Sequence, residues 1–575
     1  MSRIVPLPAS ARPAQDAASA VVSVRNLSVG FAPHTAVVDG VSFSIAAGEC
    51  LAIVGESGSG KSVTARSLLG LAGAGAWVRA DEMQIAGSSV LGSSGLGLSE
   101  RAWRTRRGTD VGLVLQDALG SLDPLRPISR EIADSLRLHT SLDRAGIETR
   151  VAQLAAGVGL QGTDARSLLA SRSGELSGGQ RQRALIASAI ALDPPLLIAD
   201  EPTTALDVTV QAQILQLLES LKERGTALLL ISHDLAVVAR IADRVAVMSE
   251  GRIVEIGQTA QVLTAPVHPV SQAMIAAIPV DKPRGTRLSA RAHPVTDRTA
   301  TRSSLLSDDP SGDHSAAIQA VGLTKTFAGR GGFRHTAVDD VSFTLQRGTT
   351  LGIVGESGSG KTTTARLALA LTEPDAGEVH LFGQPFSTAT ARDKRALRAR
   401  IGVVYQDPQD SFDPRLSVGD ILHDAVRGDG RQQSLRRRSD TLPEARRLLD
   451  SVGLASSVLD RRPATLSGGQ RQRVSIARAL ASGPDILVCD EPVSALDVTV
   501  QAQVLDLLTD LQRELSLSML FISHDLGVIQ HVSDTIAVMR AGRIVEQGDA
   551  RTVFTQPAHP YTRELLAAVP RLRQA

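Results

Sequence analysis

The octapeptide VGESGSGK occurs twice in this chain, at Val54–Lys61 and at Val354–Lys361. With the following Ser62 or Thr362, each copy fits the pattern G-x-x-x-x-G-K-[ST]. An apolar, strand-like stretch precedes each copy and a helix-like stretch follows it. Glycines in such a loop let successive backbone N–H groups surround phosphate oxygens, and the start of the helix favours anions. The sequence therefore predicts two phosphate-binding loops in one polypeptide.

Lysine is rare in this chain, yet each loop contains one. Only six lysines occur, against 61 basic residues in total, and two of the six are Lys61 and Lys361. Arginine replaces lysine readily at solvated positions but not where a compact charge must fit. We expect both lysines to reach nucleotide phosphates and the next hydroxyl to bind Mg²⁺. The loop residues assigned to ATP are Gly55, Ser57, Gly58, Gly60, Lys61 and Ser62, and Gly355, Ser357, Gly358, Gly360, Lys361 and Thr362.

The repeat extends far beyond the loops. LSGGQRQR begins at Leu176 and again at Leu466, and ISHDL begins at Ile231 and again at Ile522. A period of domain size indicates a duplicated domain, and 575 residues suit two domains. We predict an N-terminal tail at 1–20, a first domain at 21–280, a flexible linker at 281–315 and a second domain at 316–575. The linker assignment rests on its Arg, Thr, Ser, Asp and Pro content.

Composition is that of an ordinary soluble protein. Apolar residues make up 43% and charged residues 21%, and the net charge of +1 gives no indication of nucleic-acid binding. The two cysteines, Cys50 and Cys489, have no metal-type spacing, so a reducing compartment fits. No apolar run approaches the roughly 18 residues of a membrane span, and the N-terminus lacks a signal-type run. We therefore expect a cytoplasmic chain that acts on a membrane only through a partner.

Apolar runs alternate with helix-like stretches in both copies. LLIAD and ALLLIS in the first copy correspond to ILVCD and MLFIS in the second. Continuous apolar strands between helices are typical of a sheet covered on both faces, which predicts an α/β fold. The segments 117–175 and 407–465 are polar and helix-like, and we interpret them as helical insertions.

Two acidic residues end an apolar strand in each copy, Asp200-Glu201 and Asp490-Glu491. Adjacent strand residues point to opposite sides, so the two acids should have different tasks. The aspartate is expected to hold Mg²⁺ and the glutamate to take a proton from the attacking water. Simple capping of a strand end is the alternative.

Other polar residues follow neighbouring strands. His233 and His524 occur in the ISHD motifs and are expected to contact the γ-phosphate and orient water, a structural turn histidine being the alternative. Ser177 and Ser467, with Gly179 and Gly469, lie where LSGGQ begins a helix. A serine and glycine amides at a helix start form a second type of anion site.

Taken together, the phosphate loop, LSGGQ, the Asp-Glu strand, Ala-Leu-Asp (Ala205–Asp207 and Ala495–Asp497) and the histidine resemble the nucleotide-binding domains of ABC transporters. The resemblance implies two tandem P-loop domains, each with a RecA-like core, a β-rich subdomain and a helical insertion. It also implies that each ATP binds between the loop of one half and the LSGGQ of the other, within one chain. Gln116 and Gln406 would then contact metal or water, and Phe31 and Phe327 would stack on adenine, a core Phe being the alternative.

The resemblance gives each composite site a full set of residues. Site one would combine Lys61, Ser62, Gln116, Asp200, Glu201 and His233 with Ser467 and Gly469. Site two would combine Lys361, Thr362, Gln406, Asp490, Glu491 and His524 with Ser177 and Gly179. Metal ligands would be Ser62, Gln116 and Asp200, and Thr362, Gln406 and Asp490. Because both sets are complete, two competent ATP sites are expected.

Two further segments in each half resemble importer ATPases for peptides and nickel. They are QDALGSLDP (116–124) and QDPQDSFDP (406–414), and the tails PVHPVSQAMIAAIP (266–279) and PAHPYTRELLAAVP (557–570). This resemblance implies a translocase ATPase for di- or oligopeptides or related solutes, peripheral on the cytoplasmic face of the inner membrane. Its partners would be two multi-spanning permeases and an extracytoplasmic solute-binding protein. Ala118 and Val270-Ser271 depart from the pattern, and the cysteines of an iron–sulfur segment are missing.

Two other classes of twin ATPase fit the sequence less well. A ribosome-acting translation factor would carry a long charged helical linker, whereas 281–315 is short and contains proline. A DNA-repair ATPase would need zinc cysteines or long coiled coils. The sequence leaves the solute open between peptide, nickel and a glutathione-like molecule.

Overall fold

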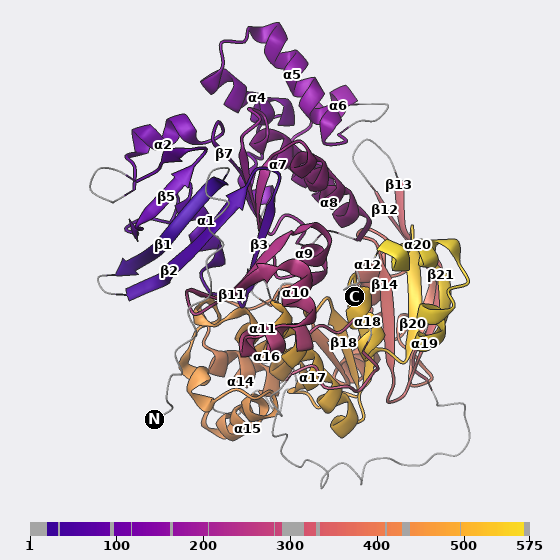
Figure 1. Cartoon of the computed structure of the whole chain (residues 1–575). Helices are drawn as coiled ribbons and strands as arrows, with labels where there is room; N and C mark the ends of the chain where they lie inside the picture. The colour runs from indigo at the N-terminus through magenta and orange to yellow at the C-terminus, as the bar shows by residue number, and fades with distance from the viewer. Residues whose placement is uncertain are drawn as a thin grey trace, which may run out of the picture. The chain divides into compact units, whose positions relative to one another are not determined.

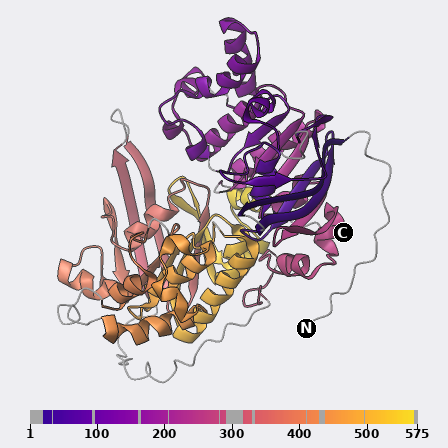
Figure 2. The ribbon, with the colours of Figure 1, turned by 90° about the vertical axis from the view of Figure 1, so that its left-hand side faces the viewer.

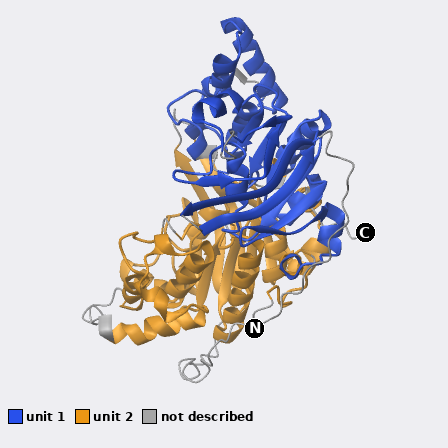
Figure 3. Cartoon of the chain, turned by 60° about the vertical axis from the view of Figure 1, so that its left-hand side comes forward, with its two compact units in different colours: residues 1–204, 211–271, 572–575 blue, residues 205–210, 272–571 orange. Residues whose placement is uncertain are grey.

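A computed structural model describes residues 20–32, 35–91, 97–116, 118–160, 165–204, 206, 208–280, 282–289, 316–328, 334–408, 411–427, 438–494 and 496–568. The chain forms two compact units (Figure 3): residues 1–204 with 211–271 and 572–575, and residues 205–210 with 272–571. The predicted tail, except for Ala20, lies outside the described residues, as do linker residues 281 and 290–315.

The core of the first unit is a six-stranded sheet. Its strand order is β11 (Arg252–Gln258), β10 (Arg244–Ser249), β3 (Cys50–Gly55), β9 (Ala227–Ile231), β8 (Leu196–Asp200) and β7 (Val111–Val114). The last five of these are parallel, and β11 pairs antiparallel with β10. Every residue of β3, β8 and β9 is buried. Burial on both faces explains why these strands are continuous apolar runs in the sequence.

The second unit repeats this sheet. Its order is β17 (Ile401–Val404), β18 (Ile486–Asp490), β19 (Ser518–Ser523), β14 (Thr350–Gly355), β20 (Thr535–Arg540) and β21 (Arg543–Asp549). The predicted α/β fold with two tandem domains is confirmed.

A smaller antiparallel sheet accompanies each core. In the first unit it consists of β1 (Ala20–Ala32), β2 (Thr35–Ala46), β4 (Trp77–Arg79), β5 (Glu82–Ile85) and β6 (Ser88–Ser89). In the second it consists of β12 (Ala316–Ala328), β13 (Arg334–Gln346), β15 (Ala376–Leu381) and β16 (Gln384–Pro385). These are the β-rich subdomains that the family resemblance implied.

Helices cover the core sheets and form the insertions. The first repeat has α1 (Lys61–Ser67), α2 (Glu100–Arg106), α3 (Ala118–Ser121), α4 (Ile128–His139), α5 (Arg144–Gly157), α6 (Ala165–Ala170), α7 (Gly178–Ala189), α8 (Val208–Glu223), α9 (Leu235–Ile241), α10 (Thr259–Thr264) and α11 (Pro269–Ala276). Residues 208–210 of α8 and 272–276 of α11 are assigned to the second unit. The second has α12 (Lys361–Ala368), α13 (Ala391–Arg398), α14 (Val418–Arg427), α15 (Arg438–Ser451), α16 (Gly468–Leu480), α17 (Val498–Leu515), α18 (Leu526–Val532), α19 (Ala550–Thr555) and α20 (Pro560–Ala568).

The predicted helical insertions are present in both units. In the first, α4, α5 and α6 protrude together from one end of the unit, apart from β1 and β2 (Figures 1 and 2). In the second, α14 and α15 occupy the corresponding stretch of sequence. Within the described part of the chain, no helix combines the length and apolar character needed to cross a bilayer.

One part of the predicted linker differs from the expectation of a solvated tether. Lys282–Ser289 lies on α17 and α18 of the second unit, and Leu288 is only 3% exposed. Its polar composition suggested solvation, but its polar groups bind acidic side chains of α17.

Candidate active site

The predicted motifs meet at one edge of each core sheet. In the first unit, the glycine loop follows β3, the two acids end β8, His233 follows β9 and Gln116 follows β7. These four strands are neighbours in the order β3-β9-β8-β7 and run parallel. Their carboxyl ends therefore bring together motifs far apart in the sequence, and such edges are where α/β folds bind ligands. The second unit has the same arrangement.

Each phosphate loop folds around its lysine. Lys61 Nζ donates hydrogen bonds to the carbonyl oxygens of Gly55 (2.8 Å) and Glu56 (2.7 Å). Lys361 Nζ makes the same two contacts in the second unit, both at 2.8 Å. Gly60 precedes α1 and has φ +101°, a backbone conformation that residues with a side chain rarely adopt. The loop therefore holds its cation beside the start of a helix, as anion binding requires.

A hydroxyl and a buried carboxylate lie side by side in each unit. Ser62 Oγ donates to Asp200 Oδ1 at 3.0 Å, and Thr362 Oγ1 donates to Asp490 Oδ1 at 3.3 Å. Burial raises the pKa of both aspartates. At Asp200, the hydrogen bond from Ser62 is the strongest effect that opposes this rise. A buried carboxylate of this kind is stabilised by a bound cation, and oxygen ligands suit Mg²⁺. These residues fit the predicted metal role.

Both glutamates have an unusual backbone. Glu201 and Glu491 have φ of +51° and +48°, in the left-handed region that non-glycine residues seldom occupy. This conformation turns the chain directly after Asp200 and Asp490. The two acids do face different partners as predicted, but the turn contributes to this separation in addition to strand alternation. Strain of this kind is often concentrated at functional sites.

The glutamate carboxylate binds both the histidine and the glutamine. Glu201 Oε1 lies 3.3 Å from His233 Nδ1, and Gln116 Nε2 donates to Glu201 Oε2 at 2.6 Å. The corresponding distances at Glu491 are 3.2 Å to His524 and 2.9 Å to Gln406. The structure thus places both glutamine amides on the proposed base, and their role as metal ligands stays a prediction.

Each histidine and glutamate stabilise one another's charge. Burial alone would raise the pKa of Glu201, but the hydrogen bond and charge of His233 outweigh it and leave that pKa lowered. Burial favours the neutral ring of His233, yet Glu201 outweighs it and raises the histidine pKa. The same directions hold for Glu491 and His524.

This pairing predicts a pH-dependent stability. A histidine pKa raised above its ordinary 6.5 stabilises the fold below that pH, and the contribution is lost as pH rises through the raised value. We expect the thermal midpoint of the wild type to exceed that of the His233→Gln, His524→Gln double variant by more at pH 6 than at pH 9. Thermal unfolding without nucleotide measures this, and an equal gap at both values would contradict the pairing.

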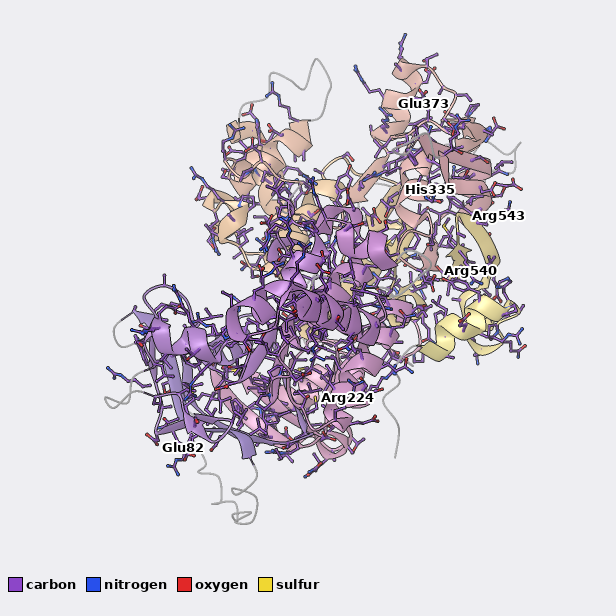
Figure 4. The ribbon with its side chains drawn as sticks, turned by 90° about the horizontal axis from the view of Figure 1, so that it is seen from above. Glu82, Arg224, His335, Glu373, Arg540 and Arg543 are labelled. Atoms are coloured by element: carbon purple, nitrogen blue, oxygen red, sulfur yellow. The ribbon has the colours of Figure 1, made fainter. Side chains whose placement is uncertain are left out.

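The second unit has a pocket of about 370 Å³ lined by residues that the sequence assigned to nucleotide. His335 of β13, labelled in Figure 4, also lines it and was not predicted. Phe31 and Phe327 are 46% and 44% exposed, so neither is the core Phe that was the alternative. The predicted residues brought together here are Phe327, Ser357, Gly358, Gly360, Lys361, Thr362, Gln406, Glu491 and His524.

The LSGGQ motifs begin helices as predicted. Ser177 Oγ and Ser467 Oγ accept hydrogen bonds from the backbone N–H of the glutamine three residues later, both at 3.3 Å. Gly179 and Gly469 lie buried in the first turn. The pairing of each LSGGQ with the opposite phosphate loop stays a prediction.

Sequence reasoning missed several neighbours of the site. Thr204 Oγ1 donates to Glu201 Oε2 at 3.1 Å. A hydroxyl recurs at the same spacing as Ser494, but it donates to the backbone carbonyl of Glu491 at 3.2 Å. Tyr561 Oη accepts from the N–H of Glu356 in the second loop at 3.4 Å. The Arg540 guanidinium, labelled in Figure 4, lies 4.6 Å from the Tyr561 ring centre.

Comparison with known proteins identifies the family. Residues 38–204 and 338–494 match the ABC transporter family, and residues 254–303 and 545–575 match the oligopeptide/dipeptide transporter C-terminal region. The glutathione import ATP-binding proteins GsiA of Escherichia coli (strain K12) and Shigella dysenteriae serotype 1 (strain Sd197) are each 42% identical over 571 residues. The alignments span 96% of this chain and 89% of each relative.

Some solved structures align with about two fifths of this chain. The cbiO1 structure from Clostridium perfringens aligns with 42% of this chain and 92% of its own, at 25% identity and a TM-score of 0.37. None of these matches supports the ribosome-acting alternative. With two ABC transporter matches, two matching tails and the candidate site residues in equivalent contacts in both units, the chain belongs to the ABC transporter ATP-binding proteins, in the group with the oligopeptide/dipeptide transporter C-terminal region.

Proposed function

We propose that this chain is the ATP-hydrolysing subunit of an importer for glutathione or short peptides. The observation that carries the proposal is the repetition of the lysine, hydroxyl–aspartate and glutamine–glutamate–histidine contacts in both units. The solute class is supported by 42% identity to glutathione import ATP-binding proteins over nearly the whole chain. Nickel remains the weaker candidate, because it rests only on the sequence resemblance.

Hydrolysis follows from the positions of the side chains. In the first unit, Lys61 would exchange its hydrogen bonds to loop carbonyls for bonds to phosphate oxygens of ATP. Glu201 would take a proton from the attacking water while the water oxygen bonds to the γ-phosphorus. The bond from that phosphorus to the bridging oxygen breaks, releasing ADP and phosphate. His233 holds the carboxylate and orients the water. Mg²⁺, held by Ser62 and Asp200, would offset the charge of the phosphates.

Each site would be completed by the other half of the same chain. We propose that Ser467 and Gly469 contact the ATP on the first loop, and that Ser177 and Gly179 contact the ATP on the second. Serine-capped helix starts are suited to this because they present backbone N–H groups to an anion. Closure on two ATP molecules and reopening after hydrolysis would then drive the membrane partners.

A second cavity suggests where a permease docks. In the second unit a cavity of about 710 Å³ lies between β17, α14 and α16, and Gln406 is one of its lining residues. Its lining also includes Tyr405, Asp407 and Arg478, and the other proposed metal ligands Thr362 and Asp490, so a segment bound here would lie beside the metal site. We propose that a short cytoplasmic segment of a permease inserts here and that a second permease uses the equivalent region near Gln116. The chain would thus be peripheral on the cytoplasmic face of the inner membrane, with a solute-binding protein outside.

Transport in cells tests the proposal. Cells that express this chain with its co-encoded permeases and binding protein should accumulate labelled glutathione or a labelled dipeptide. The matched control is the Glu201→Gln, Glu491→Gln variant at equal expression, in which uptake should fall to background. Intact ATPase activity without uptake of either solute would overturn the solute class, and labelled nickel would then be tested.

A further inference from the structure

The first part of the connection between the repeats binds two helices next to the second site. Val280 and Lys282–Ser289, here called the strap, cross α17 and α18. Its contacts with the two helices are polar at one end and apolar at the other. The repeat offers an internal comparison, because α8 and α9 of the first unit are equivalent to α17 and α18.

A buried carboxylate of α17 receives the end of the strap. Asp506 is 4% exposed and accepts hydrogen bonds from the backbone N–H groups of Leu288 (3.0 Å) and Ser289 (2.8 Å). The Ser289 hydroxyl donates to the same side chain at 2.6 Å. The equivalent residue of α8, Gln216, is exposed. A buried carboxylate requires such partners, so α17 is adapted to this strap.

Two arginines of the strap reach further along the same surface. Arg287 pairs with Asp510 of α17 at 2.7 Å. Arg284 pairs with Asp534, which lies between α18 and β20, and also donates to Gln512 of α17 at 3.3 Å. Through Arg284 the strap therefore links α17 to the end of α18.

Among its described residues, the first unit makes this link with side chains of its own helices. Lys222 of α8 donates to Asp243 at 2.9 and 3.0 Å, and Arg240 of α9 pairs with Glu219 of α8 at 3.1 Å. At the positions of Lys222 and Arg240, the second unit has Gln512 and His531, neither of which carries a permanent cation. Arg513 of α17 lines the same pocket as Asp534, but the ion pair with Asp534 is formed by Arg284. The aspartate is kept as Asp534, and its cation comes from Arg284. The strap thus supplies a brace that α8 and α9 build from their own side chains.

The other end of the strap touches the first turn of α18. A Cβ atom added to Gly527 would lie 2.7 Å from Val280 Cγ2, so glycine is needed for this approach, and the first unit has Ala236 instead. Asp525 caps α18 by accepting from the N–H of Gly527 at 2.8 Å and directly follows His524. The strap therefore packs within one turn of the histidine that binds Glu491.

We propose that the strap is a positioning element for the second site: it braces α18 against α17 and so fixes His524 on Glu491, whereas the first site is braced by Lys222. The proposal rests on ATP hydrolysis at the second loop. Arg284, Asp506 and Gly527 are its positioning residues, and none of them is placed at the reacting atoms. The two sites would then share the same catalytic groups but differ in what keeps them in place.

Hydrogen exchange and ATPase kinetics on the full chain test this together. Arg284→Ala should speed amide exchange in α18 about tenfold, as loss of one charge-assisted contact implies, and leave α9 unchanged. The matched variant Lys222→Gln should do the reverse. Adding Gln512→Lys to Arg284→Ala should restore slow exchange in α18, because it recreates the brace of the first unit.

The kinetic readout separates positioning from mere folding. Arg284→Ala should lower kcat several-fold with KM for ATP unchanged, and Gln512→Lys should restore kcat. Unchanged exchange in α18 would overturn the brace, and faster exchange with unchanged kcat would overturn the positioning of His524. A kcat loss that Gln512→Lys does not rescue would also overturn it. Absence of ATPase activity in the wild type would instead count against the proposed function.

Discussion

Replacing Glu201 and Glu491 by glutamine in one chain is expected to slow ATP hydrolysis at least about a hundredfold while ATP binding persists. Each carboxylate is placed by its left-handed backbone and held by a histidine and a glutamine, so the amide should keep the shape of the site. What it loses is the basic oxygen that accepts the proton of water. Steady-state phosphate release measures the loss of hydrolysis, and ATP binding by the same preparation measures whether affinity persists.

The repeat provides a matched control for that variant. Glu255 and Glu546 are equivalent residues outside the predicted nucleotide residues, and each accepts two backbone N–H groups of its tail, including those of His268 (3.0 Å) and His559 (3.1 Å). Their double Glu→Gln variant makes the same chemical change and should hydrolyse ATP at close to the wild-type rate. Glu201 and Glu491 would not be the bases if their own double variant kept more than about a tenth of the wild-type rate.

Much of the site could be predicted because its parts are local motifs at strand ends. The phosphate loops, the Asp-Glu pairs and the two histidines each follow an apolar run, and parallel strands bring such ends to one edge. Duplication strengthened each assignment, because a residue such as His233, ambiguous alone, recurs in register as His524. The order of the strands in the sheet then determined which motifs became neighbours.

Other features depend on contacts that no local pattern encodes. The positive φ of Glu201 is one, because a glutamate after a strand gives no sign of a left-handed turn. The strap is another: the composition of 281–315 suggests solvation, and the burial of Asp506 depends on Leu288 and Ser289, far away in the sequence. The sequence repeat shows that Gln512 stands where the first copy has Lys222. Only the position of Arg284 in the structure shows which residue replaces the lysine as the partner of the aspartate.

Changing Lys61 and Lys361 to alanine together is expected to weaken ATP binding at least about a hundredfold, because each ammonium group would form charge-assisted bonds with two phosphates of ATP. Both side chains are buried and already aimed by two loop carbonyls, so little ordering is needed when ATP arrives. Titration calorimetry with ATP measures the affinity. Lys394→Ala, outside the predicted nucleotide residues, is the control and should bind ATP like the wild type.

Single variants extend this prediction to the equivalence of the sites. Lys61 and Lys361 contact the equivalent two carbonyls of their own loops at nearly the same distances. The two loops should therefore bind ATP equally well and independently of one another. We expect Lys61→Ala and Lys361→Ala each to reduce the binding stoichiometry from about two ATP per chain to about one, as loss of one loop requires. If one single variant abolished all binding and the other none, only one loop would be a nucleotide site, and the second complete set of residues would need another explanation.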